Sequence, residues 1–447
     1  MGQPDHPGGS ATTVALAFAL LAACSSPPGH FPSESPSPSP PAEDTTIRLT
    51  VANHQALPIH DLLAEYDRDH PGITVEVIAP DYRAESEREN EGEYLRSTED
   101  PADVVVLGED AVGVMRYEAD RFVDLRGYLG AAEDDVVPWS LQQGIAPDGR
   151  LFALPATIAP SALCFRGDLL AEAGIAQDRE ELAALLTADD GHWDVYFDLG
   201  RRYRAATGRA WFDQAGFIWD AMAAQLPQGY SAPGRGELAS DPELRARWDL
   251  LTAAIADGLS ANQAAWDWND GRSFVDGTFA TFLCPEWMLG VVEGNATAGG
   301  GDASTGWDIV DAFPGGGWAW GGTYLTVSAT SEHPDDAARL VQWLTDPEQQ
   351  ATLHASAGGL PSGRQVLADL TEAATPNPFF NGAPAVAILA SRAQSVPPHV
   401  IGPEDYRIAS EAFGPALWRL EQGAAADGPA AWAEAMASLE GLDLTSP

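Results

Sequence analysis

The sequence predicts an α/β protein with two units, each an open and mostly parallel sheet flanked by helices. Its 447 residues are more than one hydrophobic core ordinarily supports, so two domains are expected. Strand and helix patterns alternate along the chain from residue 47 onward, as they do in parallel sheets with helical crossovers. Hydrophobic residues make up 45% of the chain, which is enough to fill two cores and excludes a globally disordered protein.

The first unit is expected to begin with a strand, a helix and two more strands. Residues 47–52 alternate apolar and polar side chains, which predicts a strand, and residues 59–66 place apolar side chains along one helical stripe. A second strand is predicted at 73–78. The run at 103–108 is apolar after its first residue, as expected of a parallel strand that is covered on both faces.

Polar residues follow two of these strands. Ligands of open α/β sheets bind beyond the carboxyl ends of the strands. Asn53 comes directly after the first strand, and Glu109 and Asp110 come directly after the run at 103–108. We therefore expect these three side chains to lie where a ligand would bind.

A second unit is expected to begin near residue 157. Its first strand, 161–165, is followed by a helical stretch that ends at Gly174. A glycine-rich segment at 314–322 would let the chain cross between the units before a strand at 324–327. The other predicted elements are helices through about residue 257, strands at 279–284 and 306–310, and a helix that begins at 334.

The N-terminal region has the features of an exported lipoprotein. Residues 11–23 form an apolar run that is too short to span a bilayer and has the size of a signal-peptide core. The small residues before Cys24 resemble a lipobox, so we expect a signal peptide at 1–24 and a lipid on Cys24, although residues 1–10 contain no Lys or Arg. A buried helix with a chance cysteine is the alternative. The Pro/Ser-rich stretch 25–44 predicts a semi-extended tether of roughly 60 Å.

The acidic composition excludes several classes of function. The formal net charge of −42 repels phosphate backbones, so we expect no nucleic-acid partner. All 24 basic residues are arginine, so the chain lacks the lysine of a Walker loop, of protein kinases and of pyridoxal enzymes. A saline habitat and a GC-rich genome explain these two features more simply than a direct functional role does.

Tryptophan is the most informative residue type in the second unit. Ten of the 14 tryptophans lie between positions 193 and 320, and a large flat ring is above all a good core residue. Trp287 and Trp320 follow a strand or stand beside glycines, where a ring would project into a cleft and stack on the apolar face of a pyranose. Asp110, Asp213 and Glu286 are candidate acceptors for sugar hydroxyls, and a solvated surface acid is the alternative for each of them.

Five blocks of sequence carry a resemblance to a known family. They are Leu163–Leu169 (LCFRGDL), Cys284–Gly290 (CPEWMLG), the turn at 315–322, Leu344–Gln350 (LTDPEQQ) and Asn377–Asn381 (NPFFN). Together they resemble bacterial extracellular solute-binding proteins of family 1, the lipoproteins that capture ligands for ABC sugar importers. The resemblance is to the type that takes cellobiose and related oligosaccharides.

The resemblance implies a two-lobed, periplasmic-binding-protein-like (type II) fold that closes about a hinge on a ligand in the interlobe cleft. Lobe one would comprise 45–156 and 322–362, and lobe two 157–321 and 363–447. It further implies a monomeric carbohydrate-binding lipoprotein on the outer face of the cytoplasmic membrane, with ABC permease subunits as partners and with no cofactor or metal. The candidate sugar-binding residues are Asn53, Asp110, Trp211, Asp213, Trp219, Trp268, Glu286, Trp287, Trp318 and Trp320.

Other functions remain open at this point. A secreted glycosidase needs two carboxylates facing one bond, and 66 acidic residues make chance pairs unavoidable. The sequence contains neither a G-x-S-x-G nor an H-E-x-x-H motif. A metal-capturing lipoprotein fits less well, because the nine histidines are scattered without ligand spacing. Pure adhesion has no specific feature in its favour.

Two cysteines are predicted to form a disulfide. Cys164 and Cys284 lie at the ends of two apolar strands of the same lobe, and export would place them in an oxidising compartment. Two separate buried thiols are the alternative.

Overall fold

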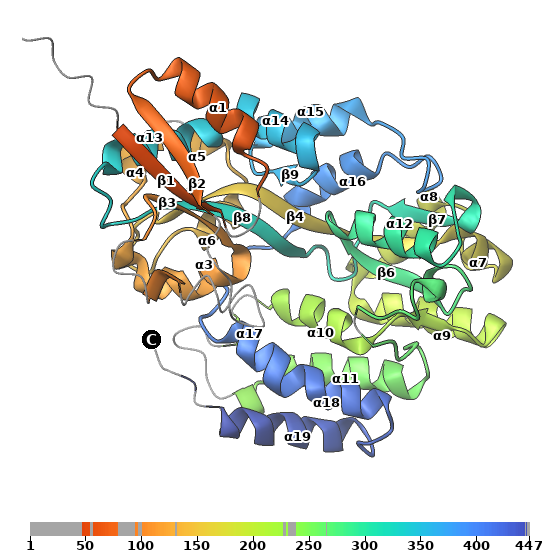
Figure 1. Ribbon diagram of the computed structural model, residues 1–447. Coiled ribbons are helices and arrows are strands. Elements are labelled where there is room, and N and C mark those ends of the chain that lie inside the picture. The colour runs from red at the N-terminus through yellow and green to blue at the C-terminus, as the bar shows by residue number, and fades with distance from the viewer. Residues whose placement is uncertain are drawn as a thin grey trace, which may run out of the picture. The chain divides into compact units, whose positions relative to one another are not determined.

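The computed structural model describes residues 47–53, 57–78, 94–96, 101–129, 132–226, 229–230, 238–264, 266–442 and 444 (Figure 1). The predicted signal peptide, the lipid site at Cys24 and the tether at 25–44 lie outside these ranges. None of the helices within the described ranges is both long and apolar enough to cross a bilayer.

One strand order, β2-β1-β3-β8-β4-β6-β5, connects both halves of the sheet. In the first half, β1 (Ile47–Asn53) lies between β2 (Ile73–Ile78) and β3 (Val104–Gly108), and both pairings are parallel. β8 (Ala319–Val327) then pairs antiparallel with β3. The predicted strands of the first unit are therefore confirmed.

A single long strand, β4 (Ala153–Arg166), belongs to both halves (Figure 1). Its first part pairs antiparallel with β8, and its second part pairs antiparallel with β6 (Phe279–Pro285) and β7 (Trp307–Val310). The other pairings are β5 (Ala210–Phe212), parallel to β6, and β9 (Leu360–Pro361), antiparallel to β4.

The sheet is mixed, whereas the sequence predicted mostly parallel sheets. The prediction rested on helical crossovers, which return a chain to the same edge and make neighbouring strands parallel. β4 and β8 instead pass through the sheet in opposite directions and pair with each other, so each half contains antiparallel neighbours. The boundaries predicted at 156/157 and 321/322 fall inside these two strands, and the division into lobes stays a prediction.

Helices cover both faces of the sheet (Figure 1). In the first half these are α1 (His60–Asp69), α3 (Glu109–Met115), α4 (Arg126–Leu129), α5 (Ala132–Asp135), α6 (Pro138–Gln143), α13 (Pro334–Leu344) and α14 (Pro347–Ala357). The others are α7 (Gly167–Glu172), α8 (Arg179–Leu186), α9 (Trp193–Thr207), α10 (Ala215–Ala224), α11 (Pro242–Ala256), α12 (Met288–Ala298), α15 (Arg364–Ala373), α16 (Ala385–Arg392), α17 (Asp405–Ile408), α18 (Gly414–Glu421) and α19 (Gly428–Gly441).

The continuous apolar run of β3 is explained by its two covered faces. Val104 and Val106 belong to one hydrophobic cluster, and Val105 and Leu107 belong to another. Side chains alternate across a strand, so a strand between two cores needs apolar residues at every position. The strand ends at Gly108, and the chain enters α3 directly with Glu109 and Asp110.

The second half is held by two aromatic-rich cores and one covalent link. Trp211, Trp219 and Trp248 lie in the cluster between the sheet and α9, α10 and α11, and each is fully buried. Cys164 of β4 and Cys284 of β6 form a disulfide, with 5.7 Å between their Cα atoms. The predicted disulfide is confirmed, and it joins two antiparallel neighbours in the sheet.

Candidate functional site

A cavity of about 270 Å³ opens where α3, α10, α17 and the start of β8 meet. The elements that line it come from distant parts of the sequence, and they include the carboxyl end of β3, where open α/β sheets bind ligands. Glycine, alanine and aliphatic residues make up half of the lining, and most of the others are acidic or aromatic. They include Glu109, Asp110, Asp220, Tyr230, Trp318, Trp320, His399, Asp405, Tyr406 and Ser410.

The floor of the cavity is built by the junction of β3 with α3. Glu109, the first residue of α3, is only 5% exposed, and its Oε2 accepts a hydrogen bond of 2.8 Å from the backbone N–H of Gly321. Gly321 has a φ of +104°, a left-handed conformation that favours glycine. Glu109 therefore ties α3 to β8, while the next residue, Asp110, lines the cavity.

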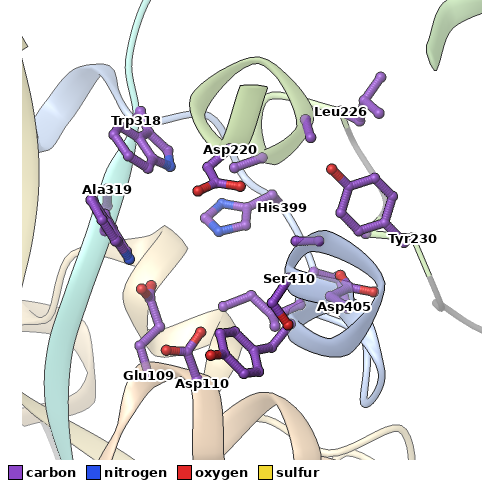
Figure 2. Close-up of a pocket in the computed structure, with 18 of the residues that line it drawn as sticks. Glu109, Asp110, Asp220, Leu226, Tyr230, Trp318, Ala319, His399, Asp405 and Ser410 are labelled. Atoms are coloured by element: carbon purple, nitrogen blue, oxygen red, sulfur yellow. The ribbon is translucent and has the colours of Figure 1, made fainter. Parts of the chain in front are cut away.

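The opposite wall comes from α10 and from the segment before α17. Figure 2 shows Asp220 and His399 near Trp318, with Glu109 and Asp110 on the other side of the space. Burial lowers the pKa of His399, so its imidazole is neutral at pH 7. The backbone carbonyl of His399 accepts a 2.8 Å hydrogen bond from Nε2 of Gln143, which fixes this segment against α6.

Aromatic rings continue from the cavity along the start of β8. Trp318 and Trp320 are stacked, with ring centroids 5.4 Å apart and planes 22° from parallel. Trp287 lies edge-on to Trp320 at 5.1 Å and donates its indole N–H to the backbone carbonyl of Trp320 at 2.7 Å. Trp266 in turn stacks on Trp287 at 6.0 Å and is 57% exposed. The four rings form a continuous series from a buried end to an exposed end, which we call the aromatic row.

The glycine-rich turn before β8 fixes the buried end of the aromatic row. Gln225, just after α10, donates from Nε2 to the carbonyls of Pro314 at 2.8 Å and Gly317 at 3.0 Å. Trp318 follows directly and is 4% exposed, so its ring is held by both α10 and the turn. The turn that the sequence suggested as a flexible crossing is thus braced by side-chain hydrogen bonds on both sides of its glycines.

The structure brings together some of the sequence-predicted site residues. Asp110, Trp318 and Trp320 line the cavity, and Trp287 contacts Trp320 beside it. Glu286 does not line the cavity. Its Oε1 accepts a hydrogen bond of 3.0 Å from the backbone N–H of Gly359, and burial raises its pKa.

Other predicted residues have structural surroundings. Trp211 and Trp219 have no exposed surface on which a sugar could stack, so we place them in the core and not among the ligand-binding residues. Trp268 is 2% exposed, and its indole N–H donates to Oδ2 of Asp213, itself 1% exposed. Neither residue lines the cavity. The side chain of Asn53 donates to the carbonyl of Leu57 and accepts from its N–H.

Sequence reasoning missed part of the site. Asp220, Tyr230 and His399 have no neighbouring pattern that separates them from ordinary surface residues, because their placement depends on how α10 and the segment before α17 pack. Trp266 had no usable signal either, because the buried Trp268 stands in the same short segment, Ala265–Asp270 (AWDWND), with the same acidic and amide neighbours.

The site can accept hydrogen bonds from several donors and cover an apolar face at the same time. Carboxylate oxygens accept hydrogen bonds from hydroxyl groups, and indole rings stack on apolar C–H surfaces. Within the described ranges, no cluster of His, Cys, Asp or Glu has the arrangement of a metal site. The chemistry of the cavity therefore suits a polyhydroxy ligand.

Comparison with known proteins identifies the family of the chain. Residues 61–381 match the family described as bacterial extracellular solute-binding protein. The crystal structure of an extracellular solute-binding protein of family 1 is 35% identical in sequence, with a TM-score of 0.81, and the match covers 88% of this chain and 99% of that one. No curated protein sequence matches the chain.

More distant structures share the fold. The galacto-N-biose/lacto-N-biose I-binding protein of an ABC transporter from Bifidobacterium longum, in complex with lacto-N-biose, is 15% identical with a TM-score of 0.66, and 90% of this chain and 97% of that one are covered. The binding protein from B. animalis subsp. lactis in complex with β-1,6-galactobiose is 19% identical with a TM-score of 0.62, with coverage of 88% and 97%.

Proposed function

Because the chain belongs to the bacterial extracellular solute-binding proteins, we propose that it captures a carbohydrate for an ABC importer. The family places the protein outside the cytoplasm and is one of binding proteins, so the glycosidase alternative does not fit it. The observation that carries the choice of a carbohydrate is the aromatic row beside an acid-lined cavity.

The ligand we propose is a di- or oligosaccharide such as a cello-oligosaccharide. The aromatic row extends over four rings, from Trp318 in the cavity to the exposed Trp266, so a ligand that reached both ends would need more than one pyranose. Two proteins of the same fold were crystallised with disaccharides, lacto-N-biose and β-1,6-galactobiose, which supports a ligand of this size. The carboxylates of Asp110 and Asp220 would accept hydrogen bonds from sugar hydroxyl groups.

Hinge closure and delivery to the permease complete the proposal. The ligand would bind between the proposed lobes, and their relative movement would bend β4 and β8, the strands shared by both halves. We propose a monomer that is attached through a lipid on Cys24 and the 25–44 tether to the outer face of the cytoplasmic membrane. This arrangement keeps the folded part within reach of the permease.

A thermal-shift screen with calorimetry tests the proposed function. The chain from residue 45 onward is mixed with glucose, cellobiose, cellotriose, maltotriose and β-1,6-galactobiose. A sugar that binds the native state alone raises Tm by mass action, and at 100 times Kd the stabilisation is about 2.7 kcal/mol. We expect a disaccharide or trisaccharide to raise Tm more than glucose does. If no sugar shifts Tm or releases heat, the carbohydrate proposal is overturned.

A further inference from the structure

The exposed ring of Trp266 is carried by a backbone of unusual conformation. Trp266 has a φ of +69°, and the nearby Trp268, Asn269 and Asp270 have φ values of +39°, +55° and +53°. Side chains other than glycine rarely adopt this left-handed region, and bulky residues do so least. Such conformations persist where the surrounding structure determines them, and they are common at binding sites. Specific contacts must therefore hold this segment.

Asp213, which follows β5, holds the segment through two hydrogen bonds. Oδ2 of Asp213 accepts the indole N–H of Trp268 at 3.2 Å, and its backbone carbonyl accepts the N–H of Gln263 at 3.1 Å. The Trp268 ring packs edge-on against Trp266, with centroids 5.4 Å apart. A buried carboxylate is thus connected to the exposed ring through one intervening indole.

We propose that Asp213 is a positioning residue that holds the Trp266 ring in place, through Trp268, as the outermost sugar platform of the aromatic row. This inference rests on the proposed function, and it deepens it by assigning the ligand a second sugar unit that lies on Trp266. Trp266 faces Trp287 and Phe217, at 6.0 and 5.7 Å between centroids, so a displaced segment would break the row at its exposed end.

The surroundings of Asp213 fit a buried hydrogen-bond acceptor and not a residue that contacts the ligand. Among the described residues, the titratable groups that face it are Glu421 of α18 and Tyr196 of α9. Burial raises the pKa of Asp213 to about 7, and Glu421 contributes in the same direction. A neutral carboxyl still accepts the Trp268 N–H through its carbonyl oxygen. An Asn side chain at this position can therefore replace it.

A double-mutant cycle tests the proposal, with cellotriose as the probe in calorimetry. W266A is expected to lower the affinity about tenfold, by analogy with the loss of one stacked aromatic ring of ~1.4 kcal/mol. D213A should lower it at least fivefold in the parent and less than twofold in the W266A background, because Asp213 acts through that ring. D213N should stay within twofold of the parent. W418A serves as the control, since Trp418 of α18 is also exposed but makes no ring contact with the aromatic row.

Three results would overturn the proposal while leaving the proposed function intact. The first is parental affinity in W266A, and the second is a D213A effect that is equally large in the W266A background. The third is a loss in D213N as large as in D213A. If D213A does not fold, W268F removes the N–H donor together with part of the indole ring system and carries the same cycle with the same expectations. A parent that binds none of the screened sugars would instead contradict the proposed function.

Discussion

Two groups of tryptophans in this protein have the same chemistry and different surroundings. Trp211, Trp219 and Trp248 are fully buried against α9, α10 and α11, where their rings are closed off from solvent. Trp320, Trp287 and Trp266 lie beside the cavity, with partly or largely exposed rings. The three buried rings come first in the sequence, but Trp307, which is also buried, lies between Trp287 and Trp320, so position along the chain does not separate buried from exposed rings. What separates them is whether a helix covers the ring.

The largest effect on stability is expected from a substitution in the buried group of tryptophans. Trp219→Ala removes a ring that packs on Trp248 at 5.2 Å and on Phe413 at 5.1 Å, and it leaves a cavity. We expect a loss of about 3–5 kcal/mol in the free energy of unfolding, measured by urea titration. The folded fraction at 10 °C should bind its sugar with parental affinity. Parental stability with lost binding would place this ring in the site instead.

The next effect concerns two buried acids, Asp213 and Glu421. Burial raises the pKa of Asp213 and of Glu421 to about 7 each. The native state therefore retains protons that the unfolded chain has released, so the free energy of unfolding falls as pH rises from about 4 to about 7. We expect the larger part of this decrease to come from Asp213, whose pKa is shifted further from its ordinary value than that of Glu421.

Neutral variants provide the control for this pH dependence. D213N and E421Q should each flatten part of the curve of urea midpoint against pH, and the double variant should flatten most of it. An exposed acid, Asp369 of α15, has no such surroundings, so D369N should leave the curve unchanged. A parent whose stability rises between pH 4 and 7 would contradict the assignment of these two carboxyls.

A smaller effect in free energy separates the cavity rings from the core rings. Trp320→Ala removes the half-buried ring that joins Trp318 to Trp287. We expect a loss of about 1–3 kcal/mol in binding, roughly ten- to hundredfold in Kd for cellotriose, with a smaller fall in Tm than Trp219→Ala causes. Calorimetry and thermal unfolding on the two variants measure the contrast directly. An early-melting variant with parental affinity would assign Trp320 to the core.

Several strands and the disulfide could be predicted from the sequence, because each of them has a local cause. The apolar run before Gly108 indicated a strand with two covered faces, and the structure confirms it with residues in two separate cores. Cys164 and Cys284 were predicted to pair because they stand on apolar strands, and β4 and β6 are neighbours. The antiparallel course of β8 has no such local cause, since it follows from long-range pairing.

The site was less predictable because its residues are selected by packing. Asp213 and Asp110 are both acids that follow strands. Asp213 accepts a hydrogen bond from Trp268 inside the protein, whereas Asp110 lines the cavity. The difference is made by the segment that carries Trp266 and Trp268, which covers Asp213 from a distance of some fifty residues along the chain. No periodicity or motif in the sequence encodes that covering.

The smallest effect we predict concerns the acid that does reach the cavity. Asp110→Asn replaces a charged acceptor by a neutral one of the same shape at the start of α3. A hydrogen bond to a charged group contributes roughly 1 kcal/mol more than a neutral one, so Kd for cellotriose should rise about fivefold. D369N changes the net charge equally but lies on α15 outside the cavity, and an uncharged sugar does not respond to the distant field. Equal effects of the two substitutions would mean that Asp110 acts only through net charge. A fivefold loss of affinity in D110N alone would identify Asp110 as a hydrogen-bond acceptor for the sugar. Asp213 cannot have this role, because Trp268 covers it.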